Sequence, residues 1–144
     1  MALKKISVPI RILRIDNDGF HLQIVVTLNR KRARLLIDTG ASRTVFDKSR
    51  IHIYTEKKHF EKTPHLSTGF GTDRLETHST EIKSVKIGTL DIKDFEAILL
   101  DLSHVNASYE SLGLKPIDGV LGCDILKKYK AVIDMGKKVL KLET

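Results

Sequence analysis

The chain has little of what stabilises secreted or membrane proteins: one cysteine, no tryptophan and no long apolar run among its 144 residues. Because Cys123 is alone, no internal disulfide can form, and we expect it to be a buried structural thiol. No apolar stretch approaches the roughly 20 residues that span a bilayer. In residues 1–15, Pro9 and several charged side chains interrupt any signal-peptide pattern. These absences predict a soluble cytoplasmic protein with no membrane partner.

Metal-binding patterns are also missing, whereas basic residues are in excess. The six histidines lack spacings such as HExxH, so the sequence predicts no metal and no cofactor. The formal net charge is +7, with basic side chains clustered at 30–34 and 127–130. Such clusters could attract nucleic acid or acidic polypeptides, but solvated turns and helix faces are the more common cause. Aromatic residues are few and not interleaved with basic ones, so a nucleic-acid partner is not favoured.

Length and composition fit one globular domain over residues 1–144, with 41% apolar and 30% charged residues. The pattern of residues 20–28 is typical of a strand, because apolar and other side chains alternate with a period of two. Further strands are expected at 33–37, 80–87, 90–100, 131–133 and 139–142, and a short helix at 124–129. Residues 103–114 fit either a short helix or an ordered loop. The balance predicts an all-β, closed barrel-like domain with one short C-terminal helix.

The segment 35–42 carries the strongest chemical signal. An acid directly after an apolar strand is costly unless its oxygens find hydrogen-bond donors. Asp38 follows such a strand and precedes Thr39 and Gly40. Glycine lets the backbone turn tightly and aim an N–H at the carboxylate, and the threonine hydroxyl can anchor the loop. An isolated Asp-Thr-Gly is a weak pattern, but its position after three β-formers strengthens it.

Two glycine-containing segments accompany this motif. Residues 119–122 are apolar, end in Gly122 and run into the expected helix. Gly69 and Gly71 flank Phe70, which could fold over a bound substrate and exclude water. An ordinary glycine turn is the alternative reading of this segment. A phosphate loop is not favoured, because no third glycine or Lys-Ser/Thr pair follows.

In chain order, the Asp-Thr-Gly motif, the segment 69–71 and the segment 119–122 resemble the retropepsin-like (retroviral-type) aspartic proteases. The chain looks close to the bacterial single-domain members, which end in a Gly-x-Asp-x-Leu helix and a terminal hairpin, and the similarity extends over about residues 18–142. The resemblance implies a closed β-barrel-like acid protease protomer that hydrolyses a polypeptide substrate without a metal. The catalytic residues it implies are Asp38, Thr39 and Gly40, and the substrate-binding residues are Ala41, Gly69, Phe70 and Gly71.

The number of acids in the motif has a consequence for assembly. The chemistry needs two carboxylates that share a proton, and the chain has one Asp-Thr-Gly. A two-fold homodimer would bring Asp38 and its copy together, and the resemblance implies that Thr39 of each protomer hydrogen-bonds across the axis. Asp134 lies in a similar Asp-Met-Gly, but the eight residues after Gly136 are too few to build a second flap or lobe. We therefore expect Asp134 to be a turn residue of the terminal hairpin. Asp124 fits a helix N-cap or first-turn acid.

Two features depart from the family pattern. Pepsin-like relatives often carry serine where this chain has Ala41, which cannot donate a hydrogen bond, so we expect a working pH closer to neutral. Retroviral enzymes usually carry arginine after the glycine that ends the second apolar segment, where this chain has Cys123 after Gly122. Another contact must therefore brace the loop that carries Asp38. We therefore expect a homodimeric aspartic endopeptidase. The alternatives are a non-catalytic peptide-binding or dimerisation module with the same fold, and a basic nucleic-acid-binding barrel.

Overall fold

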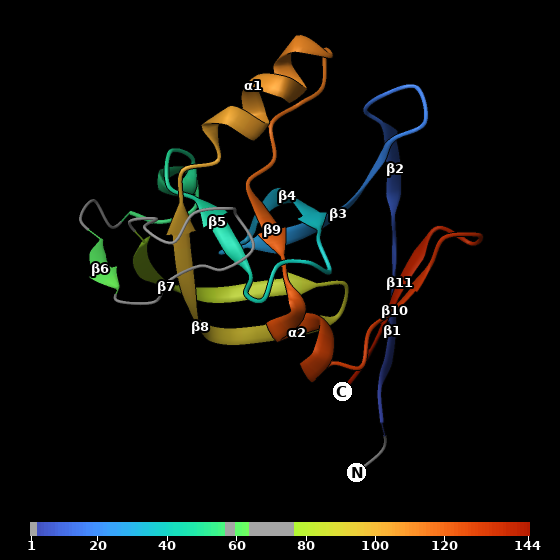
Figure 1. Ribbon diagram of the computed structural model, residues 1–144. Coiled ribbons are helices and arrows are strands. Elements are labelled where there is room, and N and C mark those ends of the chain that lie inside the picture. Colours follow the sequence, from blue (N-terminus) through green and yellow to red (C-terminus); the bar gives the residue numbers. More distant parts are fainter. Residues whose placement is uncertain (1–2, 57–59, 64–76) are drawn as a thin grey trace.

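A closed ring of strands forms the body of the protein (Figure 1). The computed structural model describes residues 3–56, 60–63 and 77–144. The ring closes because β3 pairs with β7 as well as with β4. Around the ring, the strands are β3 (Phe20–Leu28), β4 (Lys31–Ile37), β9 (Gly119–Leu121), β5 (Val45–Asp47), β8 (Leu90–Leu100) and β7 (Thr77–Ile87), with β2 (Arg11–Arg14) beside β3 and β6 (Glu61–Thr63) beside β7. The predicted closed, all-β barrel is confirmed.

The interior of the barrel follows the alternation in the sequence. In β3, Ile24, Val26 and Leu28 are buried, as the period of two predicts for one face of a strand. Phe20 begins the same pattern but is 50% exposed. The reason is topological: β3 pairs with β4 only from Gln23 onward, so the start of the strand pairs with β2 alone and extends beyond the barrel.

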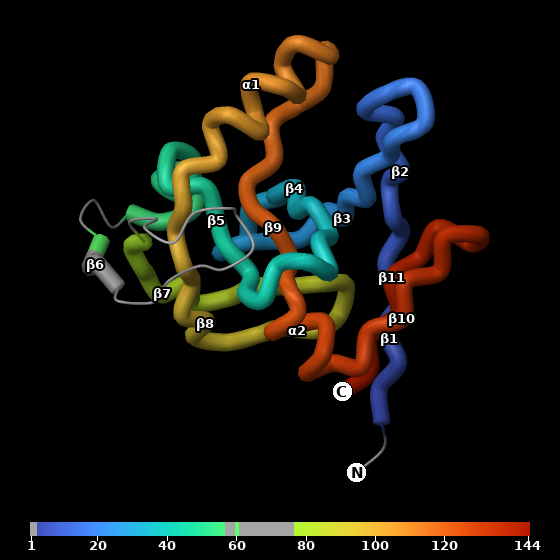
Figure 2. Tube along the Cα trace, viewed as in Figure 1, coloured from blue at the N-terminus to red at the C-terminus, as the bar shows by residue number. Residues whose placement is uncertain are grey.

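A second, three-stranded sheet joins the two ends of the chain. We call it the terminal sheet; its order is β1 (Lys5–Pro9), β11 (Val139–Glu143) and β10 (Val132–Asp134). Its buried residues Ile6, Val8, Leu140 and Leu142 belong to the same apolar core as the barrel interior. The β10–β11 hairpin was predicted, whereas β1 was not. Figure 2 shows β1 and β11 side by side, and Thr144 N donates to Lys4 O at 3.0 Å.

Two α-helices and one short 3-10 helix, η1 (Ile51–Ile53), complete the described ranges. α2 (Cys123–Lys128) matches the predicted C-terminal helix, and α1 (Ser103–Ser111) shows that the ambiguous segment is helical. α1 covers a second apolar cluster outside the barrel, where Tyr109 packs with Val45 and Val120. Of the helices in the described part of the chain, none has the length and apolar character needed to cross a membrane.

The packing of the β7–β8 turn against the terminal sheet can be tested at Gly88. Its φ is +59°, and a Cβ there would lie 2.9 Å from side-chain atoms of Ile6 and Val8. Gly113 is a matched control, because its φ is +72° but no atom lies within 4 Å of a Cβ. We expect Gly113→Ala to cost about 1–2 kcal/mol of unfolding free energy. Gly88→Ala should cost about 1–3 kcal/mol more, because β1 must move. Equal losses in denaturant unfolding would contradict this packing.

Candidate active site

Asp38 lies immediately after β4, next to the end of β9. Its backbone N–H donates to Leu121 O at 3.1 Å, which continues the parallel pairing of the two strands by one step. The predicted contact with glycine is present: Gly40 N donates to Asp38 Oδ1 at 2.8 Å. A Cβ on Gly40 would lie 3.1 Å from that oxygen, so the close approach favours glycine. The carboxylate is thereby oriented at a partly exposed position, where it can meet solvent or a ligand.

The segment that follows, which we call the Asp38 loop (residues 38–44), contacts the start of α2. Ala41 O accepts a hydrogen bond from Cys123 N at 2.8 Å. Thr44 donates from both its backbone N and its Oγ1 to Asp124 Oδ1, at 2.8 and 2.7 Å. The second apolar-glycine segment of the sequence therefore does lie against the Asp-Thr-Gly motif. Asp124 is a first-turn acid of α2, as predicted.

Cys123 is not the buried thiol that we expected. Its side chain is partly exposed, and Sγ lies 3.1 Å from Thr39 O in the Asp38 loop. The difference arises because residue 123 opens α2 beside exposed Thr39 and Gly40, rather than packing into the barrel. No sequence pattern signals this, since the contact joins segments more than 80 residues apart.

The predicted substrate-binding residues fall into two groups. Ala41 is buried and belongs to the apolar cluster that α1 covers, together with Val45 and Val120. The cluster thus reaches from the Asp38 loop to Tyr109 of α1. Gly69, Phe70 and Gly71 lie outside the described residues.

An ion pair that the sequence did not reveal, between a buried acid and a partly exposed arginine, supports the strands next to the Asp38 loop. Asp118 is 3% exposed and precedes β9 directly. Its Oδ1 accepts from Arg50 Nε at 2.9 Å, and its Oδ2 accepts from Arg34 N at 2.8 Å. Burial, and next the hydrogen bond with Asp118, raise the pKa of the Tyr54 hydroxyl above its usual range. The pair therefore ties β4, η1 and the start of β9 together.

A second buried acid anchors α1 to the barrel. Asp47 ends β5 and has no solvent-exposed surface. Its Oδ1 accepts from Ser49 N and Leu102 N, at 3.0 and 3.3 Å, and its Oδ2 accepts from Asn106 Nδ2 at 3.0 Å. Asn106 also donates to Ile117 O at 3.1 Å. These bonds satisfy a carboxylate that would otherwise be costly to bury.

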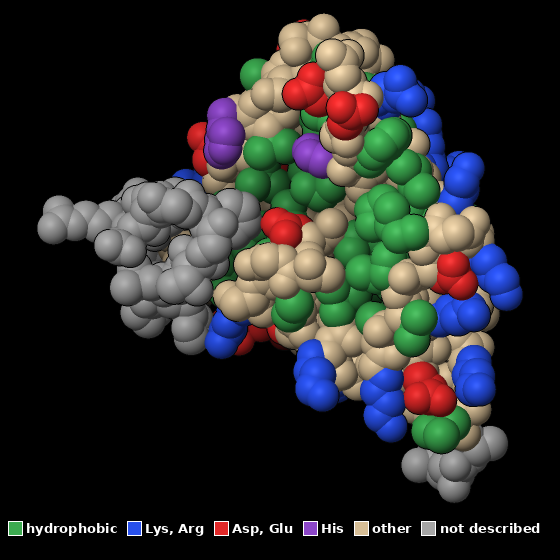
Figure 3. Space-filling model, turned by 45° about the vertical axis from the view of Figure 1, so that its right-hand side comes forward, with side chains coloured by type: hydrophobic (Ala, Val, Ile, Leu, Met, Phe, Trp, Pro, Cys, Tyr) green, Lys and Arg blue, Asp and Glu red, His purple; other side chains and the backbone are tan. Residues whose placement is uncertain are grey.

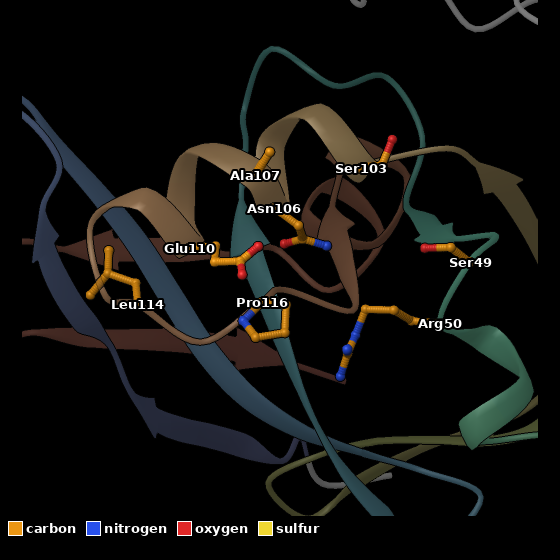
Figure 4. Close-up of a pocket in the computed structure, with 8 residues that line it drawn as sticks. All are labelled: Ser49, Arg50, Ser103, Asn106, Ala107, Glu110, Leu114 and Pro116. Carbon is orange, nitrogen blue, oxygen red and sulfur yellow. The ribbon is translucent and has the colours of Figure 1, made fainter.

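A cavity of about 490 Å³ opens beside α1 (Figure 4). Asn106 and Glu110 extend into it from α1, with Ser49 and Arg50 on another wall and Pro116 below the helix. None of residues 38–41 lines it. Of the polar residues that line it, Arg50 and Asn106 are already engaged with Asp118 and Asp47. In the described ranges, no group of three or more His, Cys, Asp or Glu side chains could hold a metal ion.

Comparison with known proteins agrees with the fold and the motif. A family model described as aspartyl protease matches residues 24–125, so the chain belongs to the aspartyl protease family. The resemblance to retropepsin-like enzymes is confirmed by solved structures of similar fold. A retropepsin-like aspartic protease from Rickettsia conorii is 19% identical with a TM-score of 0.60, covering 99% of this chain and 92% of its own.

Two further structures share the fold at similar distance. The retroviral protease-like domain of Ddi1 from Leishmania major is 17% identical with a TM-score of 0.56, covering 85% of this chain and 87% of its own. The EIAV protease in complex with the inhibitor HBY-793 is 22% identical with a TM-score of 0.56, covering 78% of this chain and 91% of its own. No match is found among curated proteins.

The pair of Asp118 and Arg50 gives a direct test. We expect Asp118→Ala to lower the unfolding free energy by about 1–3 kcal/mol, because Arg34 N and the partly exposed Arg50 side chain then lose their acceptor. Asp91→Ala is the control: Asp91 pairs with Lys93 at 2.8 Å on the surface, so its loss should leave the unfolding midpoint nearly unchanged. Chemical denaturation of both variants measures this. A small effect of Asp118→Ala would show that the pair does not support the site.

Proposed function

We propose that the chain is an aspartic endopeptidase that hydrolyses peptide bonds with a dyad of Asp38 and Asp38 from a second copy. One observation carries the proposal. This chain belongs to the aspartyl protease family, and its single Asp-Thr-Gly forms a tight loop. In that loop, Gly40 N donates to the Asp38 carboxylate at 2.8 Å. The carboxylate is oriented and accessible, as an acid or base in catalysis must be.

The chemistry follows from two close carboxylates. Both cannot be ionised at short range, so the pair holds one proton. The ionised carboxylate takes a proton from a water molecule, whose oxygen attacks the scissile carbonyl carbon. The protonated carboxyl gives its proton to the carbonyl oxygen, and a tetrahedral diol forms. As the diol collapses, the dyad gives a proton to the leaving amine and takes one from a diol hydroxyl. The C–N bond breaks, which leaves a carboxylic acid and a free amine and returns the dyad to its starting state.

Several observations support a second copy as the source of the other carboxylate. Thr39 and Gly40 are exposed beside Asp38. Figure 3 shows hydrophobic side chains gathered on the face that the terminal sheet borders, with Lys and Arg along its edge. Val132 and Met135 at the β10–β11 hairpin are 55% and 50% exposed. Contiguous exposed apolar surface of this kind marks interaction sites.

The other Asp-x-Gly of the chain does not supply the partner. Asp134 Oδ1 accepts from Lys137 N at 2.9 Å, as expected of a turn residue in the terminal hairpin. A shared dyad instead uses the same loop twice, which a two-fold dimer provides without further change.

Cleavage of a peptide library by wild type and by Asp38→Asn tests the activity. We expect Asp38→Asn to lower kcat by roughly 10²–10⁴-fold, because asparagine can neither accept nor donate the catalytic proton. Asp134→Asn is the matched control and should keep wild-type cleavage. If wild type cleaves no peptide while it still binds peptides as a dimer, the chain is a non-catalytic module. Equal cleavage by Asp38→Asn would reject Asp38 as the reacting group.

The pH profile tests the role of Ala41. A hydroxyl at this position could donate to the ionised carboxylate, stabilise it and lower the apparent pKa of the dyad. We therefore expect Ala41→Ser to move the acidic limb of kcat/KM to lower pH, by up to about one unit, since one hydrogen bond contributes roughly 0.5–1.5 kcal/mol. The midpoint between the two apparent pKa values of the pepsin dyad is about 3. Wild type should cleave best at a pH well above that value. A wild-type maximum below that value would contradict the prediction.

A further inference from the structure

The last residue of β9 and the first residues of α2 contact the Asp38 loop at both of its ends. Asp38 N donates to Leu121 O at the start of the loop. Gly122 approaches the other end so closely that a Cβ there would lie 2.5 Å from the carbonyl carbon and oxygen of Arg43. One continuous segment, residues 121–124, therefore determines where the loop begins and where it ends.

The hydroxyl of Thr44 determines which groups donate and which accept hydrogen bonds in this contact. Thr44 is 1% exposed, and its Oγ1 accepts from Gly122 N at 2.9 Å. A hydroxyl carries a single hydrogen, which is then directed at Asp124 Oδ1, 2.7 Å away. The same carboxylate oxygen accepts from Thr44 N and, within α2, from Ile125 N at 2.9 Å. Asp124 must therefore present an acceptor, and a carboxylate oxygen is a strong one.

We propose that Asp124 is a positioning residue: it holds the Asp38 loop, through Thr44, in the geometry that the reaction requires. The inference rests on the proposed function. It also identifies one contact that braces the loop in a chain that carries Cys123 where retroviral enzymes usually carry arginine. In this chain the brace is an acid two residues after Gly122, and it acts on the far end of the loop through hydrogen bonds to Thr44 N and Oγ1.

A loosened loop should affect the rate more than the binding of substrate. Asp124 contacts Thr44 and its own helix, and is not itself a reacting group. A displacement of the reacting carboxylate by about 1 Å can cost roughly 10²-fold in rate. Asp124→Ala should therefore lower kcat by about that factor with little change in KM. The apparent pKa values of the dyad should also move closer together, because two carboxylates that are held less closely are less strongly coupled.

Conservative variants separate positioning from general stabilisation. Asp124→Asn keeps an acceptor oxygen and Thr44→Ser keeps the hydroxyl, so both should retain most of the wild-type kcat, whereas Thr44→Val should behave like Asp124→Ala. Asp101→Ala is the matched control, because Asp101 Oδ1 accepts from Ser103 N at 2.9 Å in a similar contact at the start of α1. It should lower the melting temperature slightly and leave kcat and the pH profile unchanged.

The measurements are kcat, KM and the pH profile, taken well below each variant's melting temperature. Wild-type kcat and pH profile in Asp124→Ala would overturn the inference, and so would equal losses in Asp124→Asn and Asp124→Ala. If wild type cleaves nothing, the proposed function fails. Amide hydrogen exchange then tests separately whether Asp124 holds the Asp38 loop in place. Asp124→Ala should speed exchange at the amides of Thr44 and Cys123 while the amides of the terminal sheet keep their protection. Unchanged exchange in the Asp38 loop would overturn the inference.

Discussion

The structure depends on one constraint: a carboxylate placed directly after an apolar strand must find donors without losing its access to ligands. The Asp38 loop meets this constraint with the backbone N–H of Gly40, 2.8 Å from Asp38 Oδ1. A loop this tight has its position set by its surroundings, which here are the end of β9 and the start of α2. The barrel matters to the site because it brings β9, from the end of the chain, against β4 in parallel register.

Buried charge supports this arrangement from behind. Asp118 and Asp47 carry almost no exposed surface, yet each accepts several hydrogen bonds from neighbouring segments. Removing a partner from such a group is costly, whereas the fully bonded network specifies one arrangement of strands and helix. The two acids join β4 and β5 to the segments before β9, and Asp47 also fixes α1 over the apolar cluster that includes Ala41.

Much of this was visible in the sequence because the signals are local. The alternation in β3 and the Asp-Thr-Gly after an apolar strand each act within a few residues. What the sequence did not show depends on contacts between distant segments. β1 is a strand because it pairs with β11, and Cys123 lies partly exposed beside Thr39 of the Asp38 loop. The pairing of Asp118 with Arg50, or of Thr44 with Asp124, has no spacing that a pattern could detect.

The central claim is that two copies of one loop form a single dyad, and mixing wild-type and Asp38→Asn chains tests it most directly. After the chains have exchanged partners, a shared dyad predicts that activity per wild-type chain falls to about half in an equal mixture and toward zero in a large excess of the variant, because mixed dimers lack one carboxylate. Activity per wild-type chain that stays constant in excess Asp38→Asn would show that each chain acts alone and would contradict the account.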